Sequence, residues 1–196
     1  MIPAPLLACV PNVAPATLEA VIRVESGGNP LAIHVNGLWV QPPPATNAAE
    51  AARIAEGYIL RGYSVDLGLM QVNSHNLVAL GTTVERVLDP CTNVRSGAAI
   101  LTADYAEAVR SRGDGQAALQ AALSAYNTGS FYRGFANGYV ARYYGPAGVP
   151  ALAGSLREAT ATAAAATKRV VPVSPPNPFT ADTSVFVREA SNVRAE

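Results

Sequence analysis

Apolar residues recur at three- and four-residue spacing from Thr17 to about Gly145, a pattern typical of amphipathic helices. Glycine, proline and asparagine interrupt the pattern and mark the turns between helices. The pattern predicts helices over residues 15–26, 47–62, 83–89, 91–112, 115–126 and 139–145. The longest of these carries one apolar stripe, which we expect to lie in the core. Its members are Val94, Ala98, Leu101 and Tyr105.

Residues that start or stop helices support these boundaries. Pro15 suits the first turn of the first helix, and the glycines at positions 27 and 28 end it. Thr82 and Glu85 have the spacing of a capping box at the start of the short helix. Asp114 is placed to cap the helix that follows it.

Two short segments have strand character instead. Residues 32–35 and 38–40 flank Asn36 and Gly37, and this arrangement predicts a β-hairpin with a type I′ turn. Residues 64–73 contain glycine and are too apolar for an exposed loop. One small β element among several helices predicts an α+β fold that is predominantly helical.

The composition changes after Pro146. Residues 151–169 are rich in alanine, whose side chain buries little apolar area, and residues 170–179 contain four prolines. We therefore expect residues 1–148 to form the folded body and residues 149–196 to form an Ala/Pro-rich linker and tail. Within the tail, residues 185–194 are a candidate short helix or partner-binding segment.

Charge and hydropathy exclude several classes of function. The chain has 196 residues with 14 Lys and Arg against 14 Asp and Glu, and residues 1–148 carry 9 basic and 10 acidic side chains, 9 − 10 = −1. A basic surface for nucleic acid is therefore not expected. No run of about eighteen uncharged apolar residues is present, so we expect no transmembrane helix. The first residues lack a positive start, and we do not expect them to be a complete export signal.

The two cysteines, Cys9 and Cys91, are 82 positions apart. This spacing suits neither a zinc site with clustered ligands nor a CxxC redox pair. A disulfide between them would close a long loop and stabilise the fold by about 4 kcal/mol in the chain-entropy model. Two unrelated buried thiols fit the sequence equally well, so the residues alone leave both interpretations open.

Glu25 is the first candidate for chemistry. Leu18, Val21 and Ile22 precede it by seven, four and three residues, so Glu25 lies on the apolar side of its helix. It also lies at the C-terminal end, where the helix dipole disfavours negative charge. Burial and dipole together favour a protonated carboxyl near neutral pH, which a general acid requires. A surface glutamate at a frayed helix end is the alternative.

Two further segments have the composition of a binding site. In the sequence Gly-Leu-Met-Gln, Gly68 allows close backbone approach and Gln71 offers both donors and acceptors. Tyr126 and Asn127 end a helix just before a glycine. Each feature has a structural alternative, because Gly68 can mark a bulge while Met70 and Tyr126 can simply pack in the core.

Three motifs in this order resemble the lysozyme-like lytic transglycosylases, specifically the branch of bacterial type IV secretion and conjugation systems. The motifs are Glu-Ser-x-x-Asn-Pro at 25–30, Gly-Leu-Met-Gln at 68–71 and Ala-Tyr-Asn-x-Gly at 125–129. The resemblance covers about residues 9–130 and implies a lysozyme-like fold of the goose-type lysozyme class. It implies that Glu25 is the catalytic acid/base. The substrate-binding residues that it implies are Gly68, Leu69, Met70, Gln71, Tyr126 and Asn127.

One position departs from the family pattern. Many lytic transglycosylases have a serine immediately before the glycine of the Gly-Leu-Met-Gln motif, whereas this chain has Leu67. Any polar group from this side of the site would have to come from Ser64 or Asp66.

The resemblance implies cleavage of the β-1,4 bond between N-acetylmuramic acid and N-acetylglucosamine in peptidoglycan, with a 1,6-anhydro product and no cofactor. The nearest alternative is a hydrolytic muramidase with Asp66 as second carboxylate, although capping of local amides is the simpler role for this residue. A non-catalytic peptidoglycan-binding assembly factor is the alternative from another class. Trp39 or Tyr63 could form a sugar-stacking wall, but we expect core roles for both. His34 and His75 have no spacing that predicts a metal site.

A cell-wall substrate implies the periplasm, where oxidising conditions favour a disulfide between Cys9 and Cys91 over two thiols. The resemblance also implies that the enzyme locally opens the wall for assembly of a type IV secretion system. By the same analogy, the tail after Pro146 contacts components of that system. Peptidoglycan strands are the expected partner, with neither nucleic acid nor a stable membrane span.

Overall fold

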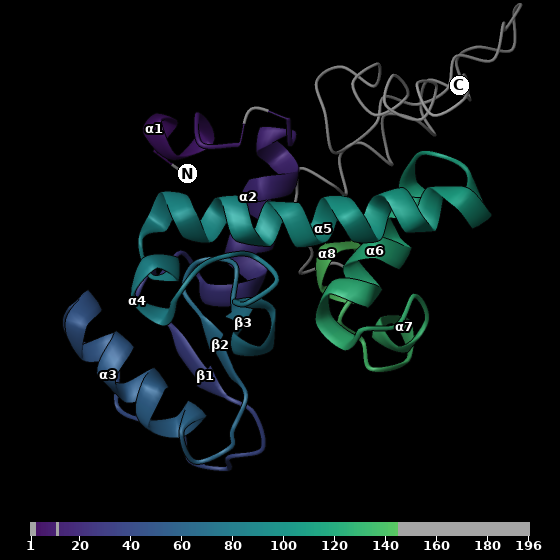
Figure 1. Ribbon diagram of the computed structural model, residues 1–196. Helices are drawn as coiled ribbons and strands as arrows, with labels where there is room; N and C mark the ends of the chain where they lie inside the picture. Colours follow the sequence, from purple (N-terminus) through teal and green to yellow (C-terminus); the bar gives the residue numbers. More distant parts are fainter. Residues whose placement is uncertain (1–2, 11, 145–196) are drawn as a thin grey trace, which may run out of the picture. The chain divides into compact units, whose positions relative to one another are not determined.

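The computed structural model describes residues 3–10 and 12–144 (Figure 1). The expected tail at 149–196, with its candidate helix at 185–194, lies outside the described residues. In chain order the elements are α1 (Ala4–Leu7), α2 (Pro15–Ser26), β1 (Ile33–Val35), α3 (Ala48–Ile59), β2 (Val65–Leu67), β3 (Val72–Asn73), η1 (Ser74–Asn76), α4 (Val84–Val87), α5 (Pro90–Arg112), α6 (Gln116–Thr128), α7 (Arg133–Ala136) and α8 (Ala141–Tyr144). The long helices confirm the helical spacing.

The chain divides into two compact units. Among the described residues, the sheet unit consists of 3–10 and 21–99, and the helical unit consists of 12–20 and 100–144. Helices α2 and α5 each contribute residues to both units. In the described part of the chain, no helix is both long and apolar enough to cross a membrane.

The sheet unit contains a three-stranded antiparallel sheet in the order β1-β2-β3, against which α3 packs (Figure 1). Its register pairs Val35 with Val65, and Leu67 with Val72. The four side chains are buried, at 0–1% exposure, and form the apolar face of the sheet. A continuous apolar face of this kind requires α3 and neighbouring elements to cover it.

The predicted hairpin between residues 32–35 and 38–40 is wrong, because β1 pairs with β2 instead. The amide of Gln41 explains the difference. Its Oε1 accepts the Val35 N–H at 2.7 Å, and its Nε2 donates to Val35 O and Leu38 O, each at 3.0 Å. A side chain therefore satisfies the backbone groups of Val35 that a second hairpin strand would have paired.

Two predicted helix caps are also wrong. Thr83, not Thr82, precedes α4 and its side chain accepts the Arg86 N–H at 3.3 Å. Gly115, not Asp114, is the residue before α6, with φ +107 and no capping side chain. Its N–H donates to the Tyr105 hydroxyl at 2.9 Å, so a core tyrosine positions the start of this helix. Only glycine adopts this backbone conformation at low cost.

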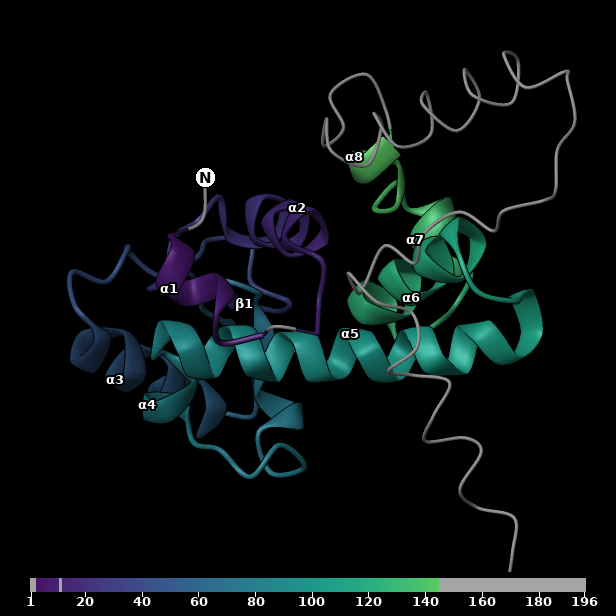
Figure 2. The ribbon, with the colours of Figure 1, turned by 90° about the horizontal axis from the view of Figure 1, so that it is seen from above.

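The helical unit depends on close packing of small residues. Five alanine or serine residues on α6 are buried, and α7 packs against this helix (Figure 2). A Cβ added to Gly134 of α7 would lie 2.6 Å from Ser124 Cα, so glycine is required there. Ser124 Oγ accepts the Gly134 N–H at 2.8 Å and donates to Ser130 O at 2.6 Å. These contacts fix the turn that joins α6 to α7.

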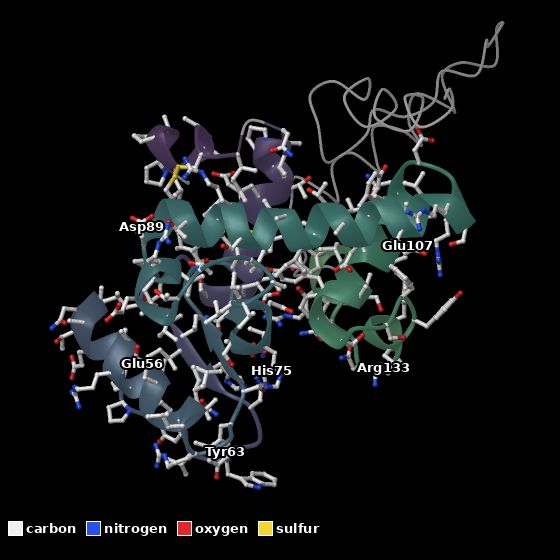
Figure 3. The ribbon with its side chains drawn as sticks, in the orientation of Figure 1. Glu56, Tyr63, His75, Asp89, Glu107 and Arg133 are labelled. Atoms are coloured by element: carbon white, nitrogen blue, oxygen red, sulfur yellow. A yellow bond between two sulfur atoms is a disulfide. The ribbon has the colours of Figure 1, made fainter. Side chains whose placement is uncertain are left out.

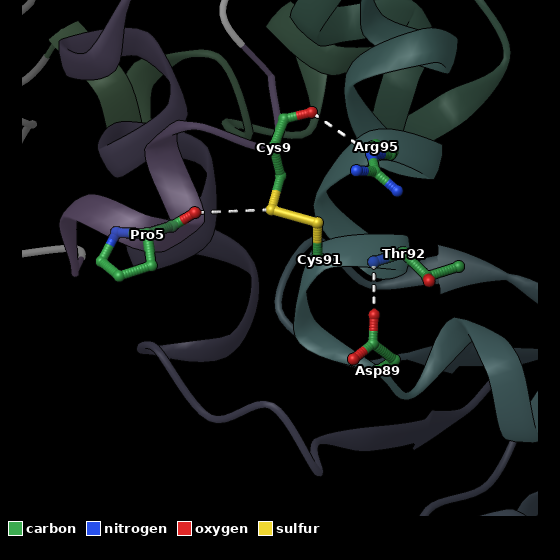
Figure 4. Close-up of a disulfide and its surroundings, with 6 residues drawn as sticks. All are labelled: Pro5, Cys9, Asp89, Cys91, Thr92 and Arg95. Carbon is green, nitrogen blue, oxygen red and sulfur yellow. Dashed lines mark hydrogen bonds between the residues drawn. A yellow bond between two sulfur atoms is a disulfide. The ribbon is translucent and has the colours of Figure 1, made fainter.

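A disulfide joins Cys9 to Cys91 at the start of α5, with the two Cα atoms 5.7 Å apart (Figure 4). The pairing confirms the disulfide interpretation over two separate thiols. Next to it, Arg95 Nε donates to Cys9 O at 3.4 Å. Asp89 Oδ1 accepts the Thr92 N–H at 2.8 Å, and this bond lowers the pKa of the Asp89 carboxyl. The crosslink therefore fastens α1 to a capped helix start.

Reducing this disulfide is expected to lower the free energy of unfolding by up to about 4 kcal/mol, because the unfolded chain regains the entropy of a long loop. Urea unfolding with and without a reductant measures the loss. The double variant Cys9→Ser/Cys91→Ser is the control and should not respond to the reductant. Labelling of two free thiols in the unreduced, unfolded wild type would contradict the pairing.

Asp104, a half-buried residue of α5, gives the helical unit a pH dependence. Burial raises the pKa of its carboxyl to about 6, from 3.8. Between these values the folded state keeps a proton that the unfolded state has lost. The free energy of unfolding should therefore fall as pH rises from about 4 to 6 and stay lower above that. We expect Asp104→Asn, but not the exposed Asp114→Asn, to remove this slope in urea unfolding at several pH values; equal slopes in both variants would contradict the assignment.

Candidate functional site

Glu25 is the second-last residue of α2 and is half-buried. Val21 and Ile22, four and three positions before it, are 0% and 4% exposed, so the helix does present its apolar side near Glu25. After Ser26 the chain turns through two glycines with φ +63 and +89. Glu25 therefore lies at the rim of the core, where a carboxyl can be both partly desolvated and reachable.

Ser26 ties this helix end to the segment 68–71. Its hydroxyl donates to Leu69 O at 2.7 Å and accepts the Gly28 N–H at 3.2 Å. Both bonds lie within the sheet unit. The structure thus brings together two of the predicted site segments, which are more than forty positions apart in the sequence.

The segment 68–71 is the turn between β2 and β3. Gly68 has φ +72, and Gln71, with φ +47, has a positive φ that is unusual for a residue with a side chain. Gln71 Nε2 donates to Gly68 O at 2.9 Å and to Ala32 O at 3.3 Å. The donor nitrogen of Gln71 is therefore used to hold the turn, which leaves the carbonyl Oε1 for a ligand.

Leu69 and Met70 differ from Gln71 in the exposure of their side chains. Their side chains are only 5% and 0% exposed, so both are core residues. Only the backbone of these two positions can contact a ligand. The packing role considered for Met70 in the sequence is thus correct, and it is compatible with a role for the Met70 main chain.

Asn93, which the sequence analysis did not identify, holds the turn 68–71 in place through side-chain hydrogen bonds to the backbone. It is 1% exposed, and its Oδ1 accepts the Met70 N–H at 2.8 Å. Its Nδ2 donates to Leu67 O and Val87 O, each at 2.8 Å. A Cβ on Gly68 would lie 2.3 Å from this nitrogen. A polar residue directly before Val94 of the apolar stripe was the signal that could have revealed it.

Asp66 lies on the polar face of the sheet, opposite His34 on one side and Asn73 on the other. Its Oδ2 accepts from Asn36 Nδ2 at 2.9 Å, and its Oδ1 accepts from Asn73 Nδ2 at 2.6 Å. Both carboxylate oxygens therefore have amide partners within the sheet unit. Leu67 beside it is 0% exposed, so this position supplies packing and no polar group.

Tyr126 and Asn127 lie in the last turn of α6, in the helical unit. Tyr126 is half-buried and Asn127 is exposed. Asn127 Oδ1 accepts from Asn137 Nδ2 at 3.3 Å, which links the end of α6 to the residue after α7. Gly129, with φ +66, ends the helix and lets the chain turn towards α7.

The core roles expected for Trp39 and Tyr63 are both wrong, because both side chains are exposed, that of Trp39 completely. Trp39 follows Leu38, whose carbonyl accepts a hydrogen bond from Gln41. Tyr63 is 37% exposed, and its ring contacts Tyr58 edge-on with 5.9 Å between centroids (Figure 3). Among the described residues no cluster of three or more His, Cys, Asp or Glu is placed to hold a metal.

The Transglycosylase SLT domain family matches residues 7–143. The chain belongs to this family. Membership agrees with the mostly helical α+β architecture and its small sheet, and confirms the expected lysozyme-like fold. No solved structure matches the chain.

This transglycosylase-domain chain is similar to proteins named virB1. It is 43% identical over 132 residues to protein virB1 of Agrobacterium fabrum, covering 67% of this chain and 53% of the relative. It is 42% identical over 139 residues to the type IV secretion system protein virB1 of Brucella abortus, covering 69% and 58%. Protein virB1 of Rhizobium radiobacter is 41% identical over 134 residues. The chain thus matches little more than half the length of these relatives.

Asn93→Ala should lower the free energy of unfolding by about 3 kcal/mol, because it leaves three buried backbone groups without hydrogen bonds. Urea unfolding followed by circular dichroism gives the value. The matched control is Asn12→Ala, at an exposed position, which should change stability by less than about 0.5 kcal/mol. Equal stabilities of the two variants would show that Asn93 does not hold the turn.

Proposed function

We propose that this chain is a peptidoglycan lytic transglycosylase that cleaves the β-1,4 bond between N-acetylmuramic acid and N-acetylglucosamine. The observation that carries the proposal is the bond from Ser26 Oγ to Leu69 O. It fastens the helix end that bears Glu25 to the turn 68–71 in a chain of the transglycosylase family. The Glu25 carboxyl and the backbone of the turn 68–71 are then held together so that both can contact the same substrate.

Glu25 acts first as acid and then as base. Its proton moves to the glycosidic oxygen as the bond from C1 of N-acetylmuramic acid breaks. The substrate's own N-acetyl group supports the positive charge at C1, so no second carboxylate is needed. The Glu25 carboxylate then takes the proton of the C6 hydroxyl, whose oxygen bonds to C1. The 1,6-anhydro product forms without water, and Glu25 regains its proton.

The other proposed site residues bind and orient. The backbone from Gly68 to Met70 and the Oε1 of Gln71 contact sugar hydroxyls and amides, because the Leu69 and Met70 side chains are buried. Tyr126 orients the substrate's N-acetyl group, and Asn127 offers an exposed amide. Hydrogen bonds with Asn93 hold the turn 68–71 in one conformation before the substrate binds.

The contacts of Asp66 favour lyase over hydrolase chemistry. A second carboxylate in a muramidase has to act on a water or on the sugar. Asp66 instead accepts amide hydrogen bonds on both oxygens and connects β2 to β3 and to the residue after β1. This supports the local structural role that the sequence also favoured.

The biological setting follows from the relatives and from the disulfide. One relative is named as a type IV secretion system protein. We propose that this chain opens the cell wall locally for assembly of such a system, and that it works in the periplasm. A disulfide fits an oxidising compartment. The tail after Pro146 is proposed to contact components of the secretion machinery.

Glu25→Gln is expected to reduce release of muropeptides from purified wall by at least about a hundredfold, because the amide cannot transfer a proton. Mass spectrometry of the soluble products measures this. Wild-type products should end in 1,6-anhydro sugar, which lacks one water relative to a reducing end. Glu56→Gln, an exposed change on α3, is the matched control and should keep full activity (Figure 3).

Three results of that experiment would contradict the proposal. Unchanged release by Glu25→Gln would remove Glu25 as the catalytic residue. Reducing-end products would identify a hydrolase. Tight binding of wall by wild type without any product would identify a non-catalytic assembly factor.

A further inference from the structure

An open depression of about 550 Å³ lies in the helical unit, between the end of α6 and α7. Its lining residues are Thr128, Arg133, Ala136 and Asn137. The depression is built on a fixed frame, because Ser124 bonds both Ser130 O and the Gly134 N–H across the turn. It is therefore a feature of the packed structure rather than of a loose loop.

Arg133 gives this depression a positive charge. Its guanidinium donates through Nη2 to Thr128 O, a carbonyl at the end of α6. A guanidinium has five N–H donors, so this bond leaves donors for a second partner. Within residues 3–10 and 12–144, no carboxylate forms an ion pair with Arg133, whereas Arg110 pairs with Glu107. Figure 3 shows Arg133 on α7.

The surrounding sequence adds to this positive character. Residues 115–144 contain Arg133 and Arg142 but no Asp or Glu, although residues 1–148 carry a net charge of −1. Every acidic residue of that body precedes residue 115. Residues 115–144 therefore carry a net charge of +2, which favours an anionic ligand at the depression.

The depression adjoins a proposed substrate-binding residue. Asn137, one of its lining residues, donates to Asn127 Oδ1 at 3.3 Å. A ligand group in the depression and a sugar at Asn127 would thus be close enough to belong to one substrate molecule. Sugars of the wall strand carry acetamides and hydroxyls, whereas the attached stem peptides carry free carboxylates.

We propose that this depression binds a carboxylate of the peptidoglycan stem peptide, with Arg133 as the charged partner and Asn137 and Thr128 as polar neighbours. Arginine presents its donors in a planar fork that matches a carboxylate. The inference rests on the proposed function, since it names the part of the same substrate that the helical unit recognises. It makes the chain selective for wall strands that still carry stems.

The test compares cleavage of two substrates, namely wall strands with stems and the same strands after an amidase has removed the stems. Arg133→Gln should lower the ratio of kcat/KM on stemmed over stripped strands about fivefold, the scale of one exposed charge pair. The change should appear in KM and shrink at high salt, because salt screens exposed charges. Arg133→Lys should keep most of the ratio, since it keeps the charge.

Arg110→Gln is the matched control. It removes an exposed arginine of the helical unit that does not line the depression, and it should leave the ratio unchanged. Urea unfolding of each variant separates a folding defect from a binding defect. An unchanged ratio in Arg133→Gln would overturn the proposal and leave Arg133 as a cap of α6. An equal loss on both substrates would also overturn it, because stripped strands have no stem and their free carboxylate is the lactyl group that the amidase exposes on the sugar.

A binding measurement keeps the inference separate from catalysis. In the Glu25→Gln background, retention on wall sacculi should exceed retention on amidase-treated sacculi, and Arg133→Gln should abolish the difference. If the proposed cleavage fails while this difference persists, only the proposed function is wrong. If cleavage occurs without any difference in retention, only the stem site is wrong.

Discussion

The backbone turn at 68–71 depends on one buried side chain, Asn93. A buried amide is costly unless its groups are paired, and Asn93 pairs both its oxygen and its nitrogen with backbone atoms. The position of the Asn93 amide also requires glycine at position 68, because a Cβ there would clash with the amide nitrogen. The conformation of the turn, the glycine at position 68 and the position of Asn93 on α5 therefore depend on one another.

Ser26 extends this arrangement to the chemistry. Its hydroxyl is bonded to the backbone that Asn93 supports, so the helix end with Glu25 is positioned against a rigid surface rather than a flexible loop. Positioning of this kind costs little at the moment of reaction, because the groups are already ordered.

Local patterns in the sequence were sufficient for the long helices and for selecting the candidate site residues, whose functional roles stay predictions, since helix spacing and short motifs are read directly from neighbouring residues. Hydrogen bonds from side chains to backbone groups six or more positions away could not be predicted in this way. The hairpin prediction failed because a Gln41 side chain bonds Val35 where a strand was expected. The cap at Asp114 failed because a distant hydroxyl, from Tyr105, binds the start of α6. Asn93 was missed because two of its three partners, Met70 and Leu67, lie more than twenty positions away.

The crosslink from Cys9 to Cys91 has a topological consequence for the sheet unit. Residues 9–91 form a covalent ring, and Glu25 and the turn 68–71 are both members of it. A single protease cut within the ring, for example at the fully exposed turn around Trp39, opens the ring but releases no fragment. The two parts of the unit remain one molecule, and their buried contacts can keep Glu25 and the turn 68–71 together after such a cut.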